Sequence, residues 1–217
     1  MLPLALGRSE GAPLRLLAIG AHPDDIEIGC CGTILKLIEE DAVSAVCWVV
    51  LSGEGERAAE ARSSAESLLA AVPDSRLMLR DFRDGFFPYD GGQIKEFFES
   101  LKEFSPDVVL THQRADLHQD HRVSCELTWN TFRDHLILEY EVPKYDGDTG
   151  SPNLFVSLSE DVRRRKVDHL MTHFSTQRPK RWFKEDLFSG LLRLRGMECN
   201  SPTSFAEAFY CRKARLG

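Results

Sequence analysis

Short apolar runs alternate with amphipathic stretches along most of the chain. The run 14–19 is almost continuously apolar and closes with Gly20, which is typical of a strand buried on both faces. Between 29 and 40, apolar residues recur at the spacing of one helix face. The same alternation predicts strands at 45–51, 76–82 and 108–111, and helices at 56–71, 93–104 and about 118–134. This order predicts an α/β fold in which a mainly parallel sheet is flanked by helices.

The pattern becomes less regular beyond Glu139. A loop, a strand, a helix, a second helix and a short apolar stretch are predicted there at 143–152, 153–158, 159–171, 182–195 and 205–211. Ser159 is expected to cap the first of these helices. No break in composition and no internal repeat divides the chain. We therefore expect an N-terminal tail at 1–12 and a single Rossmann-like domain at 13–217.

Composition places the chain among ordinary globular proteins, since its 217 residues are 42% hydrophobic and 28% charged. Acidic residues outnumber basic ones by 34 to 27, and the net charge of -7 disfavours a broad phosphate-binding surface. The basic run 163–166 lies in a predicted helix, where a solvated face is favoured over a nucleic-acid patch. No nucleic-acid partner is expected.

Targeting signals are weak in this sequence. The apolar stretch at 2–6 is too short for a signal peptide, and no stretch approaches the ~20 apolar residues of a membrane span. Six cysteines are scattered without CxxC spacing, which favours reduced thiols in a cytoplasmic protein. The sequence leaves open whether the chain forms a homo-oligomer.

Two clusters of histidine and aspartate follow predicted strands. His22, Asp24 and Asp25 come directly after the first strand, and the segment 118–121 follows the fourth. Paired aspartates before a helix often serve only as helix caps. Because the carboxyl ends of parallel strands meet at one edge of a sheet, the joint placement of both clusters favours a shared site.

The residue types of the two clusters suit a metal centre. A catalytic zinc site uses three protein ligands and leaves one position for water, and His22, Asp25 and His121 would supply such a set. Another divalent metal would suit the same donors. The remaining members would handle protons, transition-state charge and ligand orientation; these are Asp24, His118 and Asp120.

Both motifs resemble those of the PIG-L/LmbE-like N-deacetylases. The resemblance rests on 21–25 with Gly29, and on His118-x-Asp120-His121. It extends over most of the chain through shorter segments: 52–54 with Arg62 and Glu66, 84–85, 107–112, 173–177 and 206–209.

The resemblance implies a zinc-dependent amide hydrolase that removes an N-acetyl group from a small amino sugar or its conjugate. It implies zinc ligation by His22, Asp25 and His121, with Asp24 as general base. His118 would stabilise the oxyanion or protonate the leaving amine, and Asp120 would be the orienting carboxylate. Residues expected to contact the substrate are Arg62, Asp84 and His173.

Several alternatives remain open at this point. Cys30 and Cys31 stand where relatives often carry glycines, and a packing role is favoured over metal ligation. A hydrogen-bonded core position is favoured for His112. His169 and His173 have the spacing of a metal pair but lack a carboxylate in an evident motif. The alternative functions are another metal-dependent amidase or esterase, and a ligand-binding protein without catalysis.

Overall fold

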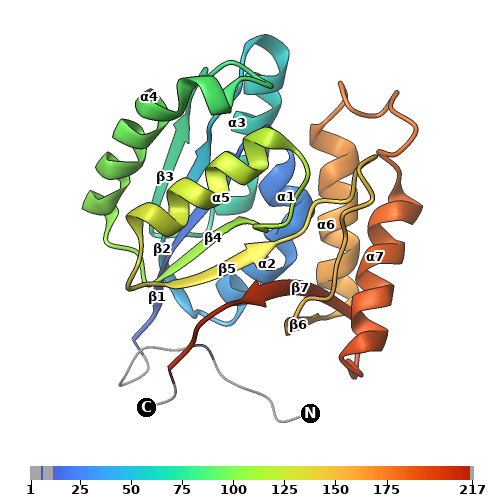
Figure 1. Ribbon diagram of the computed structural model, residues 1–217. Helices are drawn as coiled ribbons and strands as arrows, with labels where there is room; N and C mark the ends of the chain where they lie inside the picture. Colours follow the sequence, from blue (N-terminus) through green and yellow to red (C-terminus); the bar gives the residue numbers. More distant parts are fainter. Residues whose placement is uncertain (1–5, 7–11, 216–217) are drawn as a thin grey trace.

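The computed structural model describes residue 6 and residues 12–215, and these form one seven-stranded sheet with helices on both faces (Figure 1). Apart from residues 6 and 12, the expected tail at 1–12 lies outside the described residues. The strands in spatial order are β3 (Asp74–Leu79), β2 (Val43–Val50), β1 (Leu14–Gly20), β4 (Val108–His112), β5 (Leu136–Tyr140), β7 (Phe205–Cys211) and β6 (Leu154–Leu158). The first five are parallel, and β7 is antiparallel to both of its neighbours. The predicted α/β class is confirmed.

Helices cover the two faces of the sheet unequally. One face carries α4 (Phe87–Ser100), η2 (Leu101–Phe104) and α5 (Gln119–Thr131). The other carries α1 (Asp25–Gly29), α2 (Cys31–Glu39), α3 (Gly55–Leu69), α6 (Glu160–His173) and α7 (Glu185–Glu198). β1 lies between two hydrophobic cores, because Leu16 and Ala18 belong to one and Leu17 and Ile19 to the other. This explains why its sequence is apolar without alternation.

Three elements differ from the sequence prediction. The strand β5 was not predicted, because its apolar run is only three residues long before Glu139. The helix expected at 29–40 is α2, and it is preceded by the unpredicted short helix α1; the two are separated at Cys30, whose φ of -149° lies outside the helical range. The helix α4 begins at Phe87 instead of 93, since Gly91 and Gly92 concealed its first turns.

No helix in the described part of the chain is long and apolar enough to cross a membrane. All six cysteines are free thiols, and five of them are buried.

Candidate active site

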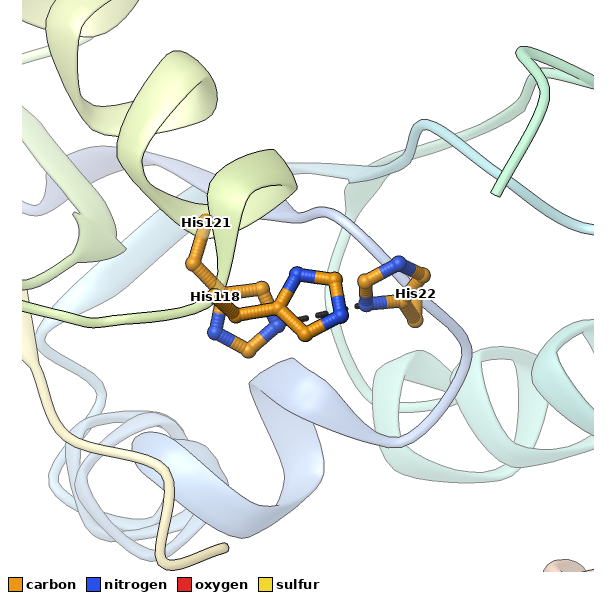
Figure 2. Close-up of side chains that lie close together, drawn as sticks. All are labelled: His22, His118 and His121. Atoms are coloured by element: carbon orange, nitrogen blue, oxygen red, sulfur yellow. Dashed lines mark hydrogen bonds between the residues drawn. The ribbon is translucent and has the colours of Figure 1, made fainter. Parts of the chain in front are cut away.

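The two predicted clusters meet at the carboxyl ends of β1 and β4. His22 and Asp24 lie on the loop that follows β1, and Asp25 begins α1. His118 caps the N-terminus of α5, and His121 lies in its first turn. Figure 2 shows the three histidine rings close together, with His22 on its loop facing His118 and His121 at the start of α5.

Three side-chain atoms form a compact donor group. His22 Nδ1 lies 3.2 Å from His121 Nε2, and Asp25 Oδ2 lies 3.5 Å from each of these nitrogens. A tetrahedral zinc site with bonds near 2.1 Å places its ligand atoms about 3.4 Å apart. All three residues are buried, which keeps water from competing for the donors. The donor chemistry and the spacing therefore both fit a divalent cation.

Both imidazoles of this group contact a carboxylate through their other nitrogen. His22 Nε2 lies 3.2 Å from Asp120 Oδ2, and His121 Nδ1 lies 2.9 Å from Asp116 Oδ2. Asp120 is itself fixed, because it accepts hydrogen bonds from the backbone N–H groups of Gly85 and Phe87. Such outer carboxylates hold a ligating histidine in one tautomer and one orientation. The sequence prediction included Asp120 but missed Asp116.

Asp116 also connects the site to the long loop after β5. Its Oδ1 accepts the backbone N–H of His118 at 2.8 Å and lies 2.9 Å from Lys144 Nζ. Lys144 bonds Asp148 Oδ2 at 2.5 Å, and the same oxygen accepts the N–H of Leu117 at 2.7 Å. These bonds hold the 141–153 segment against the loop that carries His118.

Asp24 is held in an unusual position beside the donor group. Its φ of 93° lies in the left-handed region that favours glycine. Arg57 Nη2 lies 3.2 Å from Asp24 Oδ1 and donates to the carbonyl of Pro23 at 2.7 Å. Burial raises the pKa of Asp24 well above its ordinary value, although the charge of Arg57 acts in the opposite direction. A raised pKa suits a carboxylate that takes up and returns a proton.

His118 keeps one nitrogen available. Its Nδ1 accepts the backbone N–H of Asp120 at 3.2 Å, so the neutral ring carries its proton on Nε2. Burial and the charge of His22 lower the pKa of His118. The ring is therefore a hydrogen-bond donor in its neutral form.

Of the three residues expected to contact the substrate, Asp84 lies beside His22, whereas Arg62 and His173 contact other residues. Asp84 Oδ1 lies 3.0 Å from His22 Nε2 and its side chain is largely exposed, so it faces the site opening. The structure does not bring Arg62 to this group, because Arg62 is exposed on α3 and pairs with Glu66. His173 lies at the end of α6 with its Nδ1 3.2 Å from Ser63 Oγ of α3.

Three remaining candidates, His112, Cys30 and Cys31, are buried. The expected hydrogen bond of His112 is present, since its Nε2 accepts the N–H of Ala21 at 3.0 Å. Its ring also stacks on His121 with centroids 3.9 Å apart. Cys30 and Cys31 pack in the core, where burial raises the pKa of both thiols. Among the described residues, neither these cysteines nor His169 belongs to a candidate metal group.

Comparison with known proteins identifies the family of this chain. Residues 17–132 match the family model described as PIG-L: GlcNAc-PI de-N-acetylase. The match covers more than half of the chain, so the protein belongs to the PIG-L family of deacetylases.

A relative in sequence is the uncharacterized deacetylase YaiS of Escherichia coli (strain K12). The two are 28% identical over an alignment of 189 residues that covers 81% of this chain and 98% of YaiS.

Two solved structures share the fold. The N,N'-diacetylchitobiose deacetylase from Pyrococcus horikoshii aligns with a TM-score of 0.71 and 21% identity, over 90% of this chain and 82% of that chain. GalB of Pseudomonas putida KT2440, a 4-carboxy-2-hydroxymuconate hydratase, aligns with a TM-score of 0.74 and 16% identity, over 94% and 98%. One of these enzymes is named a deacetylase and the other a hydratase, so the shared fold alone does not define the reaction.

Proposed function

We propose that this protein removes the acetyl group from an N-acetylated amino sugar or its conjugate, with zinc held by His22, Asp25 and His121. The observation that carries the proposal is the donor triad, with atoms 3.2–3.5 Å apart, beside a buried carboxylate of raised pKa. Zinc at such a site lowers the pKa of water to about 7 and polarises the amide carbonyl.

The side chains around the triad transfer the proton, stabilise negative charge and orient the ligands. Asp24 takes the proton of the attacking water and returns it to the departing amine. His118 donates from Nε2 to the oxygen on which negative charge develops, and its neutral tautomer is sufficient for this. Asp120 and Asp116 keep the two ligand rings in orientation.

The proposed substrate contacts are Asp84, His173 and Arg57. Asp84 and His173 stay proposed substrate contacts. Arg57 takes the place expected for Arg62, because it reaches Asp24 from α3 and its Nε is buried without a partner among the described residues. The free cysteines suit a reducing, cytoplasmic location.

The test measures bound zinc and amine release from N-acetylglucosamine and N,N'-diacetylchitobiose. Asp24→Asn should keep its zinc and lose about 10²–10⁴-fold in turnover, since a general base contributes about that much. His121→Ala should lose the zinc itself. Asp41→Asn, a change at an exposed position, is the matched control and should behave as wild type.

Two outcomes would overturn the proposal. Wild-type turnover in Asp24→Asn with full zinc content would remove Asp24 as the base. Hydrolysis of acyl esters or hydration of an unsaturated acid, with no amine from any N-acetyl sugar, would assign another reaction to the site.

A further inference from the structure

Exposed apolar side chains gather at the edge of the sheet that carries the site. In the described part of the chain, the large hydrophobic side chains that are exposed are Phe86, Tyr89, Leu117, Tyr145, Leu194 and Met197. The first four follow the carboxyl ends of β3, β4 and β5, and the last two lie on α7. We call Phe86, Tyr89, Leu117 and Tyr145 the apolar rim. Tyr89 is 82% exposed and Tyr145 is 78% exposed, so most of this apolar surface faces water.

Hydrogen bonds tie the first two rim segments to catalytic residues. The N–H of Gly85, which precedes Phe86, donates to Asp120 Oδ2 at 2.6 Å. Gln119 Nε2 donates to the carbonyl of Gly85 at 3.3 Å. Leu117 directly precedes His118 in the chain. The rim is therefore continuous with the site on the side of Asp84 and His118.

The third segment is fixed to the second. Asp148 Oδ2 accepts the N–H of Leu117 at 2.7 Å, and Lys144, the neighbour of Tyr145, bonds the same carboxylate. Hydrogen bonds therefore hold the three rim segments next to one another.

Two aromatic members of the rim contact each other despite their exposure. The rings of Phe86 and Tyr89 lie with centroids 5.8 Å apart, and the guanidinium of Arg83 lies 3.5 Å from the centre of the Phe86 ring. Exposed apolar side chains that gather at one edge and are held in place mark a binding site more often than a scattered residue does.

We propose that the apolar rim binds an apolar aglycone, so that the preferred substrate is an N-acetylated amino sugar linked to an alkyl or aryl group. The inference rests on the proposed function. With the sugar's acetamide at the metal donors, the rim lies beside Asp84 and His118, where the rest of the substrate would leave the site.

Other occupants fit the observations less well. A second copy of the chain needs about 800 Å² on each partner, and four partly covered side chains fall short of that area. An anionic membrane would be repelled, because the chain has a net charge of -7 and Asp84 and Asp146 are exposed within the rim segments.

The test compares methyl and n-heptyl N-acetyl-β-D-glucosaminide as substrates, with amine release as the readout. Each buried methylene favours binding by about fourfold, so burial of only two raises kcat/KM by more than about tenfold. Leu117→Ser and Tyr89→Ser should each move the heptyl-to-methyl ratio toward one. Leu194→Ser removes an exposed leucine on α7 and should leave the ratio at its wild-type value.

The results separate this proposal from the proposed function. Equal kcat/KM for both glycosides, or a heptyl-to-methyl ratio that is unchanged in both rim variants, would overturn the proposal that the rim binds the aglycone. Either result would leave the proposed deacetylation intact. If no glycoside released amine, calorimetric titration with heptyl and methyl β-D-glucoside would still test the rim, since neither has an acetyl group. Sedimentation with neutral phosphatidylcholine vesicles that depended on Leu117 and Tyr89 would assign the rim to a lipid surface instead.

Discussion

Asp116→Asn tests the support of the metal site with a change of one atom type. Asp116 accepts from His121 Nδ1 and from the N–H of His118, and it lies 2.9 Å from Lys144 Nζ. An asparagine would turn its carbonyl oxygen toward Lys144 and the backbone N–H, because both are donors. Its NH₂ would then face His121 Nδ1, which has to become an acceptor. The ring proton would move to Nε2, the atom that faces the other metal donors.

The expected loss follows from this forced tautomer. Removal of an outer partner of a ligating histidine weakens metal binding by about 10–100-fold, which is about 1.4–2.7 kcal/mol. Zinc affinity is measured by competition with a chromogenic chelator, and folding by circular dichroism. Asp148→Asn is the matched control, because the Asp148 carboxylate bonds Lys144 and the N–H of Leu117 and, among the described residues, has no bond to His121. Wild-type zinc affinity in a folded Asp116→Asn protein would refute the reasoning.

Three further predictions concern stability. Glu207→Gln removes the carboxylate that pairs with buried Lys166, and an unpaired buried charge costs about 3–5 kcal/mol. The Tm in a thermal melt should therefore fall by about 6–20 °C, and a fall of under about 2 °C would contradict this. Gly196→Ala should destabilise by about 1–3 kcal/mol in urea unfolding, because its Cβ would overlap the backbone before β7, whereas Gly190→Ala in the same helix meets open space and should be neutral or stabilising. Burial and the charge of a neighbouring histidine lower the pKa of His169 to about 3. The unfolded chain, with an ordinary pKa near 6.5, takes up this proton first, so stability is present above about pH 6.5 and falls by up to about 1.4 kcal/mol per unit below it; His169→Gln should flatten that dependence in urea titrations at pH 4–7.

The candidate cluster was predictable because its members are close in sequence and follow strands. His22 and Asp25 are three residues apart, and His118 and His121 lie at the start of α5. Parallel topology places both segments at the same edge of the sheet, and they meet because β1 pairs with β4. Asp116 was missed because it precedes the motif, although a ligating histidine ordinarily has a carboxylate partner and this was the nearest candidate upstream.

The arginine that reaches Asp24 is not the one that the sequence analysis named as a substrate contact. Arg62 and Arg57 lie on the same predicted helix, and only the rotation of that helix decides which one reaches the site. Arg57 precedes buried Ala61 and Ala65 at intervals of four residues and therefore shares their face. That periodicity was present in the sequence and favoured Arg57.

The strand β5 was harder to predict because a buried acidic residue in it depends on partners outside the strand. The carboxylate of Glu139 bonds Arg212, 73 residues later, and also accepts from Trp129 and from the backbone N–H of Arg114. A local pattern cannot show such a partner, so an acidic residue after a three-residue apolar run does not suggest a strand.

The left-handed backbone of Asp24 has a consequence for how this protein changes under selection. A residue other than glycine in such a conformation carries about 1–3 kcal/mol of strain, and here its carboxylate is also buried. Replacement by glycine would relieve the strain and would end the proton transfer proposed for Asp24. A screen of variants for heat resistance alone would therefore tend to enrich inactive sequences at position 24. Turnover has to be selected together with stability for this carboxylate to persist.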